Sequence, residues 1–280
     1  MSQGFSVSVR PREYVYAGKP EEAMRLEAQA KAFEKIIEKE LQILDLKPNM
    51  KVLDAGCGTG AVTRKMALKV YPEEAYGIDI DPLFISEAKK TALREGIKNA
   101  KFELGNIDSL TYDDGMFDLS YCRLVLMHVR SPVKTIAEFK RVTKKGGIVA
   151  ASDFDDGTIL AFPEAPRFFD LLSRLGRFAR ARGIDRYVGR KLFSLFSEAG
   201  LESVNIYLLP AYATQHDPDA LKMLVSVSTQ IAEQDKDAMI REGATTAKDY
   251  EEAMQEVQLM LEHPGAFAMG MTFLAVGRVV

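Results

Sequence analysis

A glycine-rich turn between a short apolar segment and a helical segment constrains the fold of this chain most strongly. Residues 52–55 are expected to form a buried strand and residues 61–70 a helix, with Gly56, Gly58 and Gly60 between them. Glycine permits a sharp turn and lets a ligand lie against bare backbone. The N-terminus of the following helix offers free N–H groups. The run therefore predicts a strand–turn–helix unit with a ligand site at the turn.

Short apolar segments and helical segments continue to alternate along the chain. The spacing of apolar residues predicts further strands over 74–78, 100–104, 117–122 and 147–152. Helices are predicted over 82–95 and 132–143, and a long amphipathic helix ahead of the turn over 20–44. Beyond residue 153 we expect strands over 203–213 and 267–279 and helices over 163–182, 190–199, 218–234 and 246–261. This alternation is typical of a parallel sheet with helices on both faces.

Composition limits the classes of partner. The 280 residues carry a formal net charge of −3, so bulk electrostatics favour neither a nucleic-acid nor a membrane partner. No apolar run reaches transmembrane length and no secretory leader is evident, which together with only two cysteines indicates a reducing, cytoplasmic setting. Cys57 and Cys122 fit no metal-binding spacing, so no metal site is predicted.

The glycine turn by itself does not identify the ligand. Gly56, Gly58 and Ala61 also satisfy the pattern G-x-G-x-x-G/A, which leaves a nicotinamide or flavin enzyme open. Asp54, a carboxylate just before the turn, disfavours a phosphate at this point. It favours a ligand that carries hydroxyls and a cationic amine.

Two more carboxylates follow the turn. Asp79 lies 19 residues after Gly60, at the end of the next predicted strand. An acid at this position accepts hydrogen bonds from ribose hydroxyls in nucleoside-binding sites. Asp81 precedes a proline at the start of a predicted helix, so it is expected to cap that helix.

Five segments taken together resemble one family. Residues 52–60 and 76–82 resemble the first two motifs of the class I S-adenosylmethionine-dependent methyltransferases. Three further segments agree with that family in order and spacing, namely 105–108, 117–119 and 144–147. The resemblance implies a doubly wound, mostly parallel seven-stranded α/β sheet of the Rossmann-like type, with an antiparallel last strand and a helical cap. It also implies S-adenosyl-L-methionine as the cofactor.

The resemblance also implies three parts of the chain. Residues 1–45 would form an N-terminal helical cap segment, and residues 46–155 the core that binds S-adenosylmethionine. Residues 156–280 would complete the sheet, with helical cap insertions at about 160–200 and 216–263.

Individual positions of the donor site follow from the same resemblance. Asp79 would accept both ribose hydroxyls, and Asn106 stands where the family usually has an aspartate that holds the adenine amino group. An amide oxygen can accept the same hydrogen bond, and Asp108 is the alternative. The other implied contacts of the donor are Asp54, Gly56, Cys57, Gly58, Gly60, Ile80, Ile107, Cys122 and Arg123.

The parts outside the core are expected to close the site. Arg25 and Gln29 share a face of the predicted 20–44 helix. The resemblance implies that this helix closes over the cofactor, with Arg25 at the methionine carboxylate and Tyr14 or Tyr16 closing the site. A solvated polar face is the alternative for this pair. The arginines between residues 167 and 182 suit either a solvated helix face or the recognition of an anionic substrate.

Three residues are candidates for catalysis. His128 interrupts an apolar run and is either a packed histidine or a polar group near the transferred methyl. Asp153 and Asp155 follow the fifth strand, as a general base or as loop caps. We expect a methyltransferase acting on an O, N or C nucleophile of a small molecule, with an anionic acceptor left open. The alternatives are an NAD(P)-dependent oxidoreductase and a non-catalytic cofactor-binding module. Monomer and homodimer both remain open.

Overall fold

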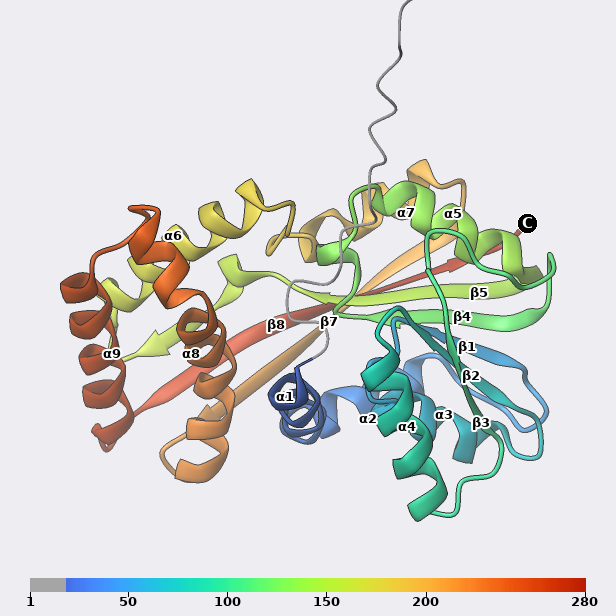
Figure 1. Cartoon of the computed structure of the whole chain (residues 1–280), viewed down its shortest axis with the longest axis horizontal. Coiled ribbons are helices and arrows are strands. Elements are labelled where there is room, and N and C mark those ends of the chain that lie inside the picture. The colour runs from blue at the N-terminus through green and yellow to red at the C-terminus, as the bar shows by residue number, and fades with distance from the viewer. Residues whose placement is uncertain (1–18) are drawn as a thin grey trace, which may run out of the picture.

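The computed structural model describes residues 19–280 of the chain. Its frame is one eight-stranded sheet, which Figure 1 shows running across the molecule. The strands are β1 (Val52–Ala55), β2 (Ala75–Asp79), β3 (Ala100–Leu104), β4 (Phe117–Arg123), β5 (Thr143–Phe154), β6 (Leu160–Phe162), β7 (Glu202–Thr214) and β8 (Phe267–Arg278).

The order of the strands confirms the expected Rossmann-like topology. β3, β2, β1, β4 and β5 are neighbours in that order and all pair in parallel. β8 is antiparallel to β5, and β7 pairs with the other edge of β8. The reversal from β3-β2-β1 to β4-β5 places a crevice at the carboxyl ends of β1 and β4, where sheets of this kind bind ligands.

The predicted count of seven strands was wrong by one. The additional strand, β6, pairs with the start of β8, beyond the last β5 pair at Phe154 and Thr272. We expected only cap helices there, since three residues are too few to show the alternation of a strand.

Helices cover both faces of the parallel part of the sheet (Figure 1). α5 (Pro132–Val142) and α7 (Leu192–Glu198) pack on one face, where Leu53, Phe117 and Phe139 are buried together. α2 (Glu34–Ile43) and α3 (Ala61–Val70) pack on the other face around Met66 and Leu119, and α4 (Pro82–Arg94) packs against β3. Single 3-10 turns cover Leu126–His128, Asp156–Thr158 and Gly189–Lys191.

The single helix expected over 20–44 is in fact two helices. α1 (Pro20–Ala32) is separated from α2 by Phe33, and Figure 1 shows α1 nearly end-on where α2 lies lengthwise. Phe33 is buried and its ring meets that of Phe154 edge-on, with the centroids 5.0 Å apart. The change of direction follows this tertiary contact, which the helical spacing of apolar residues does not reveal.

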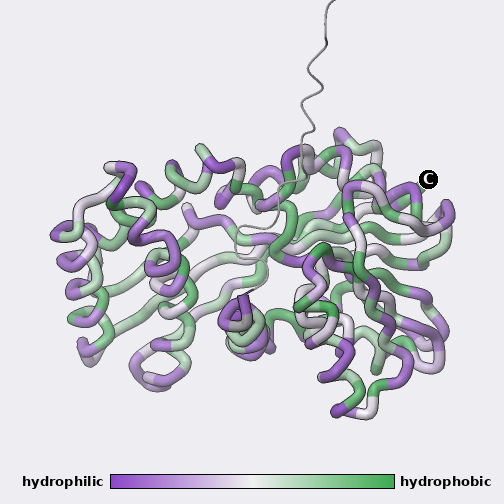
Figure 2. Tube along the Cα trace, in the orientation of Figure 1, coloured by the Kyte–Doolittle hydropathy of each residue, from purple (hydrophilic) through white to green (hydrophobic). Residues whose placement is uncertain are grey.

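A second group of helices covers the far ends of β7 and β8. α6 (Pro166–Ala181), α8 (Pro218–Arg241) and α9 (Ala247–Glu262) pack on one another around Leu175, Leu221 and Ala253. We call this group the cap helices. Figure 2 shows hydrophobic residues along the strands of the sheet and hydrophilic residues on the outer turns. Within residues 19–280, none of the helices has the length and apolar character needed to span a bilayer.

Candidate functional site

A cavity of about 490 Å³ lies at the carboxyl ends of the parallel strands. One end is lined by the glycine turn after β1, the end of β2 and the loop after β3. The other end reaches between β6, β8 and the cap helices, and α1 lines the cavity as well. The cavity therefore joins the crevice expected for a nucleotide-like ligand to a second chamber under the cap.

The glycine turn is held against the second strand by a carboxylate. Gly58 has a φ of +54° and donates its backbone N–H to Oδ2 of Asp79 over 2.8 Å. Gly60 has a φ of +78°, and a Cβ there would lie 2.4 Å from the ring of Phe102. Gly56, Cys57 and Gly58 line the cavity, whereas Gly60 does not and serves the turn itself.

The end of β2 presents an acid and an exposed apolar side chain to the cavity. Oδ1 of Asp79 accepts the backbone N–H of Asp81 over 2.9 Å, and burial raises the pKa of Asp79. Ile80 lines the same wall and is 42% exposed. Asp81 accepts the N–H of Leu83 at the start of α4, which confirms its predicted role as the N-cap.

The loop after β3 brings its three predicted residues to the cavity. Asn106, Ile107 and Asp108 all line it. Oδ1 of Asn106 accepts the backbone N–H of Asp108 over 2.9 Å, and Asp108 accepts the hydroxyl of Thr135 on α5. The side chains of Asn106 and Asp108 thus stabilise the loop in addition to facing the cavity.

Asp54 and the two cysteines have different surroundings. Asp54 lines the cavity, accepts the hydroxyl of Thr63 over 2.6 Å, and has its pKa raised to about 7 by burial. Cys57 also lines the cavity, whereas Cys122 is fully buried in the apolar core and does not line it. The position of Cys122 therefore does not support the predicted contact with the donor.

A buried ion pair behind the cavity was missed in the sequence. Arg123 is the last residue of β4, lines the cavity and donates from Nε to Oε2 of Glu40 over 3.2 Å. Glu40 is fully buried on α2 and also accepts the hydroxyls of Tyr121 and Ser152, over 2.7 and 2.5 Å. Glu40 lies three residues after Ile37, on the same apolar face of α2. An acidic residue on an apolar helix face was the feature of the sequence that could have predicted a buried charge.

One nitrogen of this arginine has no partner. The Arg123 side chain is 7% exposed, and its buried Nη2 makes no hydrogen bond with the residues of 19–280. The guanidinium lies 5.5 Å from the ring centroid of Phe33. Since a buried unpaired donor is costly, this nitrogen is suited to a ligand acceptor in the cavity.

The structure describes two of the residues that were expected to close the site over the cofactor. Arg25 and Gln29 of α1 both line the cavity. Arg25 forms two hydrogen bonds with the buried carboxylate of Glu22, over 2.8 and 2.6 Å, and Gln234 of α8 donates to the same carboxylate over 3.1 Å. Tyr14 and Tyr16 lie outside the described residues.

The three catalytic candidates are placed differently. His128 lines the cavity, and burial together with the nearby Arg186 and Arg25 lowers its pKa to about 4, so its imidazole is neutral at pH 7. Asp155 lines the cavity but is paired with Arg190. Asp153 is fully buried, does not line the cavity, and has its pKa raised to about 7 by burial.

Two arginines of α6 form ion pairs with acids, most of which lie on α9. On α6, Arg174 pairs with Asp170 and with Asp249 of α9, over 2.7 and 3.1 Å. Arg167 meets Glu252 and Glu256 of α9. Acids are scarce near these arginines in the sequence, but the fold brings α9 alongside α6.

Comparison with known proteins identifies the core. A family model described as a methyltransferase domain matches residues 46–175. An uncharacterized methyltransferase of Schizosaccharomyces pombe is 30% identical over 168 residues, which is 58% of this chain and 60% of that protein. The chain therefore matches less than two thirds of this relative's length. The family resemblance expected from the sequence is confirmed for the core, and the comparisons give no support to the nicotinamide alternative.

Solved structures share the fold over most of the chain. A SAM-dependent methyltransferase from Aquifex aeolicus superposes with a TM-score of 0.56 at 16% identity, covering 94% of this chain and 99% of that one. A phosphoethanolamine N-methyltransferase of Haemonchus contortus, solved with phosphomonomethylethanolamine and S-adenosylhomocysteine, gives a TM-score of 0.59 at 14% identity, covering 92% and 58%. At these identities the likeness shows the fold.

Proposed function

We propose that this chain, whose residues 46–175 match a methyltransferase domain, transfers a methyl group from S-adenosylmethionine to a nucleophile of a small molecule. The observation that carries the proposal is a pair of opposite groups on one cavity. Asp79 offers carboxylate oxygens beside the glycine turn, and Arg123 offers a buried N–H that has no partner within residues 19–280. A nucleoside with an amino-acid tail needs both.

The residues of the cavity fit each part of this donor. Asp79 would accept the ribose hydroxyls, and the exposed side chain of Ile80 would cover a face of the adenine. Asn106 and Asp108 line the cavity on the next loop and would hold the adenine edge. Arg123, held by Glu40, would take the methionine carboxylate, because its Nη2 is buried and has no hydrogen bond among residues 19–280.

Methyl transfer from the donor mainly requires that the protein hold the two reactants in position. The sulfonium of the donor makes its methyl carbon electrophilic. An acceptor atom bonds to that carbon as the carbon–sulfur bond breaks, the electron pair stays on sulfur, and S-adenosylhomocysteine leaves. Holding the two reactants in line supplies a large share of such a rate enhancement. For an O–H or N–H acceptor, the neutral imidazole of His128, which lines the cavity, would accept a hydrogen bond from that group. Because its pKa is lowered to about 4, the released proton would pass on to solvent.

Different segments of the chain line the two ends of this cavity, so they would bind different reactants. Residues 46–155 would bind the donor, and residues 156–280 would enclose the acceptor, since β6, β8 and the cap helices line the other end of the cavity. α1 lies beside the glycine turn, because a Cβ on Gly58 would lie 3.3 Å from Leu26.

The proposal is tested with methyl-labelled S-adenosylmethionine and a mixture of small metabolites. Wild-type chain is expected to move label into the small-molecule fraction, and the Asp79→Asn variant to move much less. Label found only in macromolecules, or the same small-molecule labelling by both chains, would contradict the proposal.

A further inference from the structure

The chamber under the cap has mainly apolar walls. We define it as the part of the cavity between β6, β8 and the cap helices α6 and α8. Its apolar lining comes from separate segments of the sequence and includes Leu160, Phe168, Leu224, Ile231 and Met269. Leu160 lines the cavity and is still 57% exposed, so part of this apolar surface has no protein cover.

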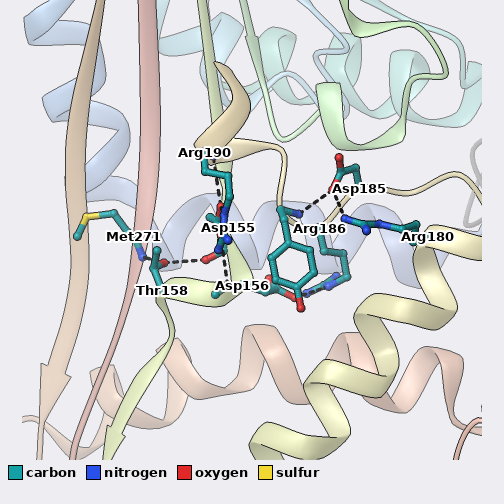
Figure 3. Close-up of polar contacts among 10 residues, drawn as sticks. Asp155, Asp156, Thr158, Arg180, Asp185, Arg186, Arg190 and Met271 are labelled. Carbon is teal, nitrogen blue, oxygen red and sulfur yellow. Dashed lines mark hydrogen bonds and ion pairs between the residues drawn. The ribbon is translucent and has the colours of Figure 1, made fainter. Parts of the chain in front are cut away.

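Two arginines around this chamber form ion pairs with aspartates of the protein. Arg186 and Asp156 are 2.5 Å apart, with both side chains 9% exposed. Arg190 meets the buried carboxylate of Asp155 over 2.5 Å, and Figure 3 shows both pairs where β5 ends. An anionic acceptor would have to displace one of these carboxylates, at a cost in desolvation and lost pairing.

Two further arginines that line the cavity do not add an unpaired positive charge beside the cap helices. Arg182 lines the cavity and is 2.5 Å from Glu242, with its guanidinium over the ring of Phe178. Arg130 lines the cavity but is exposed, on the segment after β4. From α8, the hydroxyl of Ser228, the amide of Gln234 and the carboxylate of Asp235 also line the cavity.

From these walls we infer that the methyl acceptor is an uncharged, largely apolar small molecule with its reactive atom at one end. Apolar lining with a few placed polar groups is typical of sites for such molecules. This class differs from phosphomonomethylethanolamine, the ligand named for the Haemonchus contortus structure. The inference rests on the proposed function, because it assigns the chamber to the acceptor.

The test uses the full chain saturated with S-adenosylhomocysteine and two probes. Nile red, a neutral apolar dye, is titrated by fluorescence, and phosphoethanolamine is titrated by calorimetry. We expect saturable binding of Nile red and no binding of phosphoethanolamine. Absence of saturable dye binding, or clear binding of phosphoethanolamine, overturns the inference.

A matched pair of variants locates the dye. Leu160→Glu places a charge on the chamber wall, and Leu259→Glu does the same on α9, at a side chain that is 68% exposed and does not line the cavity. Leu160→Glu is expected to weaken Nile red binding by about tenfold, as for one lost leucine contact, and Leu259→Glu to leave it unchanged. Equal dye affinity in both variants would place the dye elsewhere and refute the inference.

The same variants separate this inference from the proposed function. Leu160→Glu is expected to bind S-adenosylhomocysteine as the wild type does, since Leu160 lies at the cap end of the cavity. Failure of the wild type to bind S-adenosylhomocysteine would overturn the proposed function, and the chamber assignment with it. Normal binding of that ligand with a failed dye experiment would overturn only the acceptor class.

Discussion

Replacing Arg123 with methionine tests the assignment of the donor's carboxylate. The substitution keeps an apolar stem of similar length and removes the guanidinium, whose Nη2 is buried and without a hydrogen bond in residues 19–280. A hydrogen bond to a charged group contributes about 1.5–3 kcal/mol. We therefore expect Arg123→Met to weaken S-adenosylhomocysteine binding by about 10- to 150-fold.

The assay compares two ligands that differ only in the amino-acid tail. Titration calorimetry with S-adenosylhomocysteine measures the full donor site, and titration with 5′-methylthioadenosine measures the nucleoside part alone. Arg123→Met is expected to lose affinity for the first ligand and to keep its affinity for the second. The ratio of the two affinities does not depend on how much of the protein is folded.

Glu40 supplies the matched second variant. Glu40→Gln keeps the shape of the side chain but removes the charge that holds the guanidinium at 3.2 Å. Its effect on the affinity ratio is expected in the same direction and smaller. Removing one partner of a buried ion pair typically costs about 3–5 kcal/mol of stability, so thermal unfolding is measured alongside. Equal losses for the two ligands, or no loss for either, would refute the assignment of the carboxylate to Arg123.

Three further predictions concern the turn, the second strand and a buried acid. Asp79→Asn is expected to weaken S-adenosylhomocysteine binding about tenfold or more, while Asp81→Asn, which retains a good N-cap outside the cavity, is expected to bind normally in the same titration. Gly60→Ala is expected to destabilise the chain by about 2–4 kcal/mol in denaturant unfolding, from its positive φ and its overlap with a ring. Gly96→Ala also has a positive φ but meets nothing within 4 Å, and equal losses in both glycine variants would contradict the packing argument. Asp153 has a pKa raised to about 7 in the folded state, so the folded chain holds its proton more tightly than the unfolded chain. The free energy of unfolding should therefore fall more steeply in wild type than in Asp153→Asn as the pH rises from about 4 to 7, and parallel curves would argue against it.

The parallel half of the fold could be predicted because its signals are local. The run from Val52 to Gly60 contains a strand and a turn and ends at the residue before α3. Asp81 is recognisable as a cap from its own position before a proline. β6 could not be predicted, since a strand of three residues is defined by its pairing with β8.

The site was predictable where it follows strand ends and hidden where it depends on packing. Asp79 and Asn106 reach one cavity because parallel strands end at the same edge of the sheet. Glu40 is separated from Arg123 by 83 residues, and only the packing of α2 on the sheet brings them together. The same reason explains why the acids of α9 that pair with the α6 arginines escaped the sequence argument.

The central claim is that the cavity binds the methyl donor, and parallel equilibrium titrations with S-adenosylhomocysteine and NAD⁺ test it most directly. The account predicts one saturable site for S-adenosylhomocysteine, weakened by Asp79→Asn, and no comparable binding of NAD⁺. Tight binding of NAD⁺ with none of S-adenosylhomocysteine would contradict it.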